Sequence, residues 1–220
     1  MKLFTRRTMM MWSLAVVAAL AAAIVAVVHS GSSKASPVRQ ATPLAQMQLS
    51  PAVKAAILKA ARQNGADPAN VVELGGSGSG SQHHGVLAGT DASGATMVSF
   101  LTGFGMSDFV VASRYANSDR AMLVTDSVEG PSTDARIVGI VGVATRAVQR
   151  VTVDLANGTT ITLAVSRAPG IPYQGFSYVS SNANTFPAKV TGYNAGGKAL
   201  AEHTVDARPL CPASRPDCTR

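Results

Sequence analysis

The sequence has little charge, and that charge is unevenly distributed. Only 14% of the 220 residues are charged, and the formal net charge is +7. From residue 47 onward, fourteen Lys and Arg residues stand against twelve Asp and Glu residues, a net of +2. A nucleic-acid binder needs a dense basic face, so this nearly neutral body argues against nucleic acid as a partner. No acid precedes residue 49, but five basic residues do: Lys2, Arg6, Arg7, Lys34 and Arg39.

The familiar catalytic motifs are also missing. The chain has no Gly-x-Ser-x-Gly elbow and no Ser-x-x-Lys pair, which are signatures of serine nucleophiles. Gly103-Phe104-Gly105 lacks the third glycine of a dinucleotide-binding loop, and the Gly/Ser run at 75–81 has no Lys for a phosphate loop. We predict no metal site and no cofactor. These absences favour a protein without a standard active site.

One long apolar run lies near the N-terminus, at residues 9–28. It reads MMMWSLAVVAALAAAIVAVV, and Ser13 alone interrupts it. Twenty helical residues rise about 30 Å, which matches the hydrocarbon core of a bilayer. Residues 1–8 form a basic n-region without acids, which predicts a cytoplasmic N-terminus and a C-terminus outside. We therefore expect a transmembrane or signal helix that contacts the membrane.

Two fates of this segment stay open. A run of this length favours a retained single-pass anchor in the cell membrane, because the apolar cores of secretory signals are usually shorter. Small residues follow the run, so a signal peptidase could instead cut after Ser30 or Ala35 and release a secreted protein. Arg6 and Arg7 partly match a twin-arginine signal, but the strong hydrophobicity favours the general secretion route.

The chain has only two cysteines, Cys211 and Cys218, in a Pro-containing tail at 209–220. The compartment predicted for this tail is oxidising, so we expect the two thiols to form a small disulfide loop. In the chain-entropy model such a loop stabilises a fold by roughly 2–3 kcal/mol. A metal site would need more ligands, and the tail adds only Asp217.

Three segments of different composition follow the apolar run. Residues 29–48 are rich in Ser, Pro, Gln and Ala, which predicts a flexible linker. Residues 49–74 predict an amphipathic helix and a turn. Residues 75–85 predict a Gly/Ser/His loop, either disordered or acting as a flap, because Gly and Ser offer almost no side chains to pack.

The helix within 49–74 has clear end signals. Ser50 can act as N-cap, Pro51 occupies the first helical position, and Gly65 follows the last turn. The apolar positions Val53 and Ile57, continued by Ala60 or Ala61, line one face. We expect this face to pack against the domain, since too few basic residues are present for binding to a membrane surface.

Residues 86–208 have the pattern of a β domain. Turn residues between apolar runs predict β-hairpins at 89–95, 154–159 and 192–198. Ile137 to Val143 is apolar throughout, which favours a central strand covered on both faces. Short strands at this spacing predict a mainly β fold, specifically a β-sandwich, immunoglobulin-like or similar, although closure into a barrel stays open.

Candidate binding residues are few, because aromatic residues make up only 5% of the chain. His83 and His84 are adjacent, and neighbours on a strand point in different directions and rarely bind one ion together. Phe104 and Tyr173 belong to two aromatic groups that could line a groove or pack in the core. We take these four residues as the candidate ligand-binding set.

The stretch from Ile137 to Val143, with the strand Val148 to Leu155 and the turn Asn157-Gly158, resembles a pattern of exported proteins in high-GC Gram-positive bacteria. In that pattern a Val-rich strand meets a hairpin with an Asp-Gly or Asn-Gly turn, and a later turn has Asn- or Asp-x-Gly, as at 194–197. The resemblance covers the last third to half of the chain. That group is uncharacterised, so it implies an exported β domain and no catalytic residue.

Two functional hypotheses follow. The first is a membrane-anchored or secreted extracytoplasmic β-domain that binds a protein, a glycan or a small molecule without catalysis. The second is an exported hydrolase with a non-standard site near His83 and His84, completed by acids between 119 and 134. A signalling receptor is disfavoured, because residues 1–8 are too few to form a cytoplasmic output domain.

Overall fold

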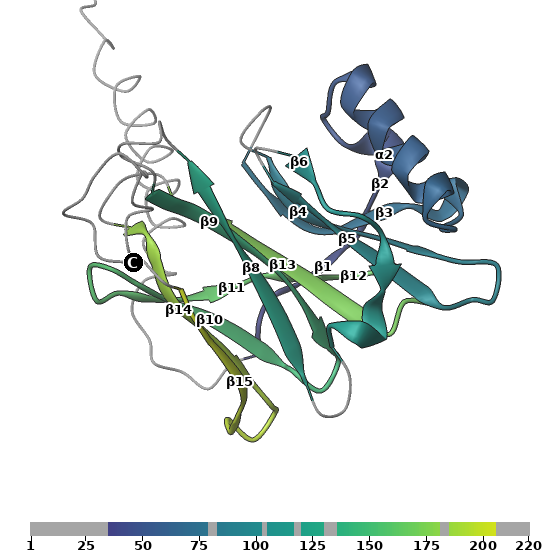
Figure 1. Cartoon of the computed structure of the whole chain (residues 1–220). Coiled ribbons are helices and arrows are strands. Elements are labelled where there is room, and N and C mark those ends of the chain that lie inside the picture. The colour runs from purple at the N-terminus through teal and green to yellow at the C-terminus, as the bar shows by residue number, and fades with distance from the viewer. Residues whose placement is uncertain are drawn as a thin grey trace, which may run out of the picture. The chain divides into compact units, whose positions relative to one another are not determined.

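Strands dominate the regular structure of the computed structural model, in which several sheets lie beside one α-helix (Figure 1). This confirms the prediction of a mainly β fold with one preceding amphipathic helix. The structure describes residues 35–78, 83–102, 105–116, 120–129, 136–180 and 185–205, with only the backbone for 126–129 and 136–138.

The described strands lie in three sheets. The five-stranded sheet has the order β1 (Val38–Gln40), β12 (Val165–Arg167), β13 (Tyr173–Val179), β9 (Arg136–Thr145) and β8 (Met122–Glu129). The four-stranded sheet has the order β11 (Thr160–Leu163), β10 (Arg150–Leu155), β14 (Pro187–Tyr193) and β15 (Ala199–Thr204). The third sheet has the order β2 (Thr42–Pro43), β3 (Val72–Ser77), β4 (His84–Thr90), β5 (Thr96–Thr102) and β6 (Gly105–Met106), and β7 (Val110–Val111) also pairs with β5.

The strand β9 is central, as the apolar run predicts. It pairs with β13 on one side and β8 on the other. Ile140 and Ala144 belong to a core that includes residues of the four-stranded sheet, whereas Val141 and Val143 belong to a core with residues of the third sheet. All four side chains are fully buried. Strand alternation therefore places one apolar core on each face of the five-stranded sheet.

The helix α2 (Pro51–Gln63) packs on the domain, as predicted. Ser50 caps its N-terminus by accepting a hydrogen bond from the Val53 N–H at 3.3 Å. Ile57 and Ala61 are buried in a third core with Leu87 and other residues of the third sheet. The prediction for Val53 is wrong, because this side chain is 38% exposed. The buried stripe therefore begins one turn later than the sequence pattern indicates.

All three predicted hairpins are present. The strand pairs β4–β5, β10–β11 and β14–β15 each close through the expected turn. In the first turn, Asp91 Oδ1 accepts hydrogen bonds from the backbone N–H groups of Ser93 and Ala95, both at 2.9 Å. This local bonding is the reason that Asp favours such turns.

Two predicted boundaries are wrong. The flexible linker expected over 29–48 is, from residue 35 onward, part of the fold: β1 and β2 lie here, and Leu44 and Met47 are buried. The loop expected over 75–85 is largely a hairpin, because β3 runs to Ser77 and β4 begins at His84. The β domain thus begins before residue 86. Glycine is tolerated in these strands because other groups occupy the space beside it: the Gly175 backbone at Gly75, and the Glu73 side chain at Gly76 and Gly85.

Glycines allow β3 and β13 to cross at close range. A Cβ placed on Gly75 would lie 2.9 Å from the carbonyl oxygen of Gly175, and one placed on Gly175 would overlap the backbone carbonyl of Leu74. Gly75 has a positive φ of 74° and lies at a register shift between β3 and β4. A β-bulge with glycine in this conformation bends its strand. The third sheet therefore contacts the five-stranded sheet through backbone at this point.

The membrane-related predictions fall on residues outside the description. Among the residues that the structure does describe, no helix is long and apolar enough to cross a bilayer. The n-region 1–8, the apolar run 9–28 and the cysteines Cys211 and Cys218 all lie outside the described ranges. Anchorage, export and the disulfide stay predictions.

Candidate functional site

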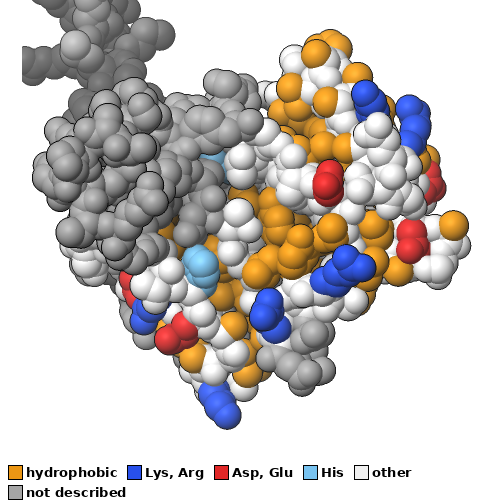
Figure 2. Space-filling model, viewed as in Figure 1, with side chains coloured by type: hydrophobic (Ala, Val, Ile, Leu, Met, Phe, Trp, Pro, Cys, Tyr) orange, Lys and Arg blue, Asp and Glu red, His pale blue; other side chains and the backbone are white. Residues whose placement is uncertain are grey.

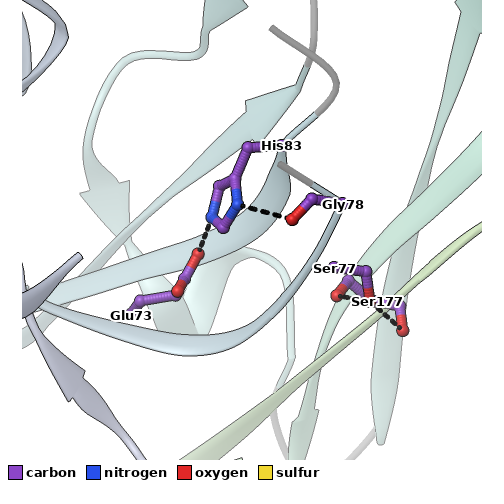
Figure 3. Close-up of polar contacts among 5 residues, drawn as sticks. All are labelled: Glu73, Ser77, Gly78, His83 and Ser177. Carbon is purple, nitrogen blue, oxygen red and sulfur yellow. Dashed lines mark hydrogen bonds and ion pairs between the residues drawn. The ribbon is translucent and has the colours of Figure 1, made fainter. Parts of the chain in front are cut away.

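A buried carboxylate and a histidine join the two strands of the β3–β4 hairpin. Oε1 of Glu73 on β3 lies 2.5 Å from Nε2 of His83, which directly precedes β4 (Figure 3). The side chains are 8% and 16% exposed, respectively. A charge at this depth requires a partner of opposite charge or several hydrogen bonds. The imidazole of His83 supplies that partner.

Two glycines make room for this carboxylate. A methyl group placed on Gly76 or on Gly85 would overlap the carboxyl group of Glu73. Gly76 and Gly85 face each other across the β3–β4 pair. Any larger residue at either position would displace the carboxylate from this space, so the glycines position Glu73 as much as its own strand does.

His83 has the surroundings of an imidazolium. Its Nε2 faces Glu73 Oε1, and its Nδ1 lies 3.4 Å from the carbonyl oxygen of Gly78. Both neighbours are acceptors, and only the protonated ring donates from both nitrogens. The hydrogen bond to Glu73 raises the pKa of His83 above its ordinary value of 6.5, against the lowering effect of burial. The ring is therefore held as a donor and not as a base.

A polar cleft of about 300 Å³ lies where β3 crosses β13. Most of its lining comes from the third sheet and the five-stranded sheet, Leu163 and Ala164 complete it, and Glu73 is among the lining residues. The other lining residues are mostly polar or small: Arg39, Gln40, Thr42, Gly75, Gly76, Ser77, Leu163, Ala164, Ser166, Ser177 and Tyr178.

The hydroxyl groups on the β3–β13 side of the cleft already donate their protons. Ser177 Oγ donates to Ser77 Oγ at 2.8 Å, and Ser77 Oγ donates to the Ser177 carbonyl oxygen at 3.2 Å (Figure 3). The side chain of the next residue, Tyr178, lies on the opposite face of β13, where it packs on the core that includes the four-stranded sheet and donates to the Thr185 carbonyl oxygen at 2.7 Å. The two serine oxygens keep lone pairs, so this wall of the cleft offers acceptors.

The β1–β12 side of the cleft has donors that are still free. Ser166 is only 5% exposed, yet its hydroxyl makes no hydrogen bond within the described ranges. The exposed guanidinium of Arg39 likewise has no hydrogen bond or ion pair to any described residue. A hydroxyl that lines a cleft and has no protein partner can bond to water or to a ligand there.

A second, more apolar groove of about 450 Å³ lies between β5 and β8. Figure 2 shows hydrophobic side chains gathered over this part of the face. The rings of Phe100 and Tyr115 in its lining are 5.7 Å apart and tilted by 57°. Phe104, the predicted binding residue nearest to it in sequence, lies outside the described residues.

The other predicted site residues do not assemble. His84 is 1% exposed within β4, and half-buried Tyr173 packs on the core beside β9. Asp119 and Asp134, and the side chains of Asp126 and Glu129, lie outside the description. Among the described residues, no group of three His, Cys, Asp or Glu side chains could hold a metal ion.

The sequence reasoning found His83 but missed Glu73, Arg39 and Ser166. Glu73 had a usable signal, because it is the one acid in the apolar stretch Val71–Leu74 and a hairpin would bring it near His83. Arg39 and Ser166 had none, since they meet through a parallel pairing between strands far apart in the chain.

No protein-family model, no curated protein and no solved structure matches this chain. Function is therefore argued from the site.

Proposed function

We propose that this chain is a membrane-anchored or secreted β-sandwich domain that binds a polar ligand outside the cytoplasm without catalysis. The polar cleft at the β3–β13 crossing is its ligand site. The apolar run at 9–28 supports the location, and the apolar cores on both faces of β9 support the sandwich arrangement.

The observation that carries this proposal is the unbonded polar lining of the cleft. Arg39 and Ser166 present donors, while Ser77 and Ser177 present acceptors. A small-molecule site needs a concave shape and a few convergent polar groups that orient the ligand, and the volume of about 300 Å³ suits a ligand the size of one sugar ring. Residues of the third sheet and of the five-stranded sheet both line the cleft, so a bound ligand would contact both sheets.

The bonding of His83 disfavours the alternative, an exported hydrolase. A general base needs a ring nitrogen with a free lone pair near the nucleophile. Both nitrogens of His83 face acceptors, and the serines of the cleft bond to each other instead of to the ring. The proposal therefore assigns His83 to holding Glu73.

The location is tested by intact mass. The full chain with a C-terminal tag is recovered separately from membranes and from culture supernatant, and each form is weighed. Full-length mass in the membrane fraction supports the anchor, and a supernatant form cleaved after Ser30 or Ala35 supports secretion. Full-length protein confined to the cytoplasm contradicts export.

Binding is tested by backbone amide NMR shifts of the purified full chain against a set of sugars, hydroxy acids and short peptides. Shift changes centred on the cleft residues support the proposal. The compounds are also assayed for turnover by the wild type and by His83→Ala. Turnover that disappears in a folded His83→Ala variant would establish the hydrolase instead.

A further inference from the structure

Arg39 and Ser166 form one structural unit in the cleft. They are register partners in the parallel pairing of β1 with β12. Register partners project to the same face of a sheet. Ser166 is also the partner of Gly175, where β3 crosses most closely. The guanidinium and the hydroxyl therefore both lie on the face of the five-stranded sheet that meets β3.

The two groups have complementary chemistry for one kind of ligand atom. A guanidinium presents its N–H groups in a planar fork that matches a carboxylate, and a hydroxyl adds one more donor. Ser166 is 5% exposed as a whole residue, it lines the cleft, and no described residue accepts the proton of its hydroxyl. An oxyanion in the cleft would supply the missing acceptor for both.

The charge around the cleft favours a single negative charge. Arg39 contributes a positive charge, while the carboxylate of Glu73 already has the imidazole of His83 as its hydrogen-bond partner. Arg39 therefore has no carboxylate partner among the described residues, and a ligand carboxylate would supply one. A phosphate dianion would bring excess negative charge close to Glu73, and an amine would meet Arg39.

The opposite wall suits hydroxyl groups on the ligand. The hydroxyl groups of Ser77 and Ser177 donate their protons to protein acceptors, and their oxygen atoms keep lone pairs that can accept further hydrogen bonds. Hydroxyl groups of a ligand would donate to such oxygens. From this arrangement we infer that the cleft binds a hydroxylated carboxylate of the kind an acidic sugar presents, with the carboxylate on Arg39 and Ser166. This inference rests on the proposed binding function and gives its ligand class.

The test compares two probes that differ mainly at one group, D-glucuronate and D-glucose, with inorganic phosphate as a third. Each is titrated into the ¹⁵N-labelled full chain, and amide shifts at residues 39 and 166 report occupancy. We expect glucuronate to bind the wild type more tightly than glucose by about tenfold, the effect of a charged hydrogen bond. Phosphate should bind more weakly than glucuronate.

Three variants test whether Arg39 and Ser166 cause the preference for glucuronate over glucose. Arg39→Gln should remove it, and Ser166→Ala should weaken glucuronate binding by about threefold to tenfold, the loss of one hydrogen bond. Arg114→Gln is the matched control, because Arg114 is an exposed arginine that does not line the cleft, and it should bind as the wild type does.

The outcomes separate the inference from the proposed function. Equal binding of glucuronate and glucose, with shifts in the cleft, overturns the carboxylate inference and leaves the binding function standing. Absence of amide shifts at residues 39 and 166 with glucuronate also overturns the carboxylate inference. The titrations with the other sugars, hydroxy acids and short peptides then test the proposed binding function by themselves. If Arg39→Gln and Arg114→Gln weaken glucuronate binding equally, the preference for glucuronate reflects only the overall positive charge of the protein. That result would overturn the assignment of the carboxylate site to Arg39.

Discussion

The carboxylate of Glu73 lies 2.5 Å from the imidazole of His83, and this contact links β3 to the residue that directly precedes β4. The same carboxylate lines the polar cleft. One ion pair thus connects the stability of the hairpin with the charge of the proposed site, and both should respond to the protonation of His83.

Stability should depend on pH through His83. Glu73 raises its pKa in the folded protein above 6.5, so the pair contributes fully below pH 6.5 and loses its contribution as pH rises through the folded pKa. The free energy of unfolding, measured with urea across this range, should fall more steeply in the wild type than in His83→Gln.

The same coupling predicts the titration of the ring itself. In Glu73→Gln, the NMR-measured pKa of His83 should move back toward 6.5, because the acceptor loses its charge. An unchanged pKa in this variant would mean that Glu73 does not hold the ring in solution.

Gly85→Ala should displace the Glu73 carboxylate, because the new methyl group would occupy its place. We expect a loss of roughly 1–3 kcal/mol in the free energy of unfolding, the usual cost of overpacking. Gly89→Ala on the same strand is the control, since its nearest neighbour would be at 3.6 Å, an ordinary contact. Adding Glu73→Ala to Gly85→Ala should recover part of the loss, and strict additivity would argue against the clash.

Gly175→Ala should be more damaging than Gly85→Ala. Its methyl group would meet the backbone carbonyl of Leu74, which cannot rotate away as a side chain can. We expect chemical denaturation to give a loss at or beyond the upper end of the roughly 1–3 kcal/mol range for overpacked sites. Gly196→Ala has its nearest neighbour at 3.4 Å, in a turn, and should change stability by about 0.5 kcal/mol or less. Similar effects of the two substitutions would contradict the close crossing of β3 and β13.

Two buried serines should respond differently to alanine. Ser36 accepts a hydrogen bond from the buried Val151 N–H at 2.9 Å, so Ser36→Ala should cost about 1–3 kcal/mol. Ser166 has no such bond to a described residue, so Ser166→Ala should change stability by about 0.5 kcal/mol or less. Urea unfolding of both variants provides the comparison. A large loss in Ser166→Ala would assign that hydroxyl a structural partner instead of a ligand.

Local features of the fold were predictable from sequence, and long-range ones were not. Asp91 with Gly94 fixes its hairpin by bonds to the nearest backbone groups, and Ser50 with Pro51 starts α2 in the same local way. The linker prediction was wrong because Leu44 and Met47 gain their burial from residues far along the chain. Composition alone does not reveal such partners.

In the candidate site, too, the local feature was predictable from the sequence and the long-range contacts were not. His83 is conspicuous in the sequence, but its role depends on Glu73 across a bulged hairpin and on Gly85, which looks like a loop residue. Arg39 and Ser166 meet only because β1 pairs in parallel with β12. Parallel pairing between distant strands leaves no local sequence pattern.

The most direct test is a crystal structure of the full chain with D-glucuronate bound. We predict the sugar in the cleft at the β3–β13 crossing, with its carboxylate oxygens within hydrogen-bonding distance of the Arg39 guanidinium and the Ser166 hydroxyl. A sugar seated in the apolar groove beside Phe100 and Tyr115, or one in the cleft with its carboxylate turned away from Arg39, would contradict the account.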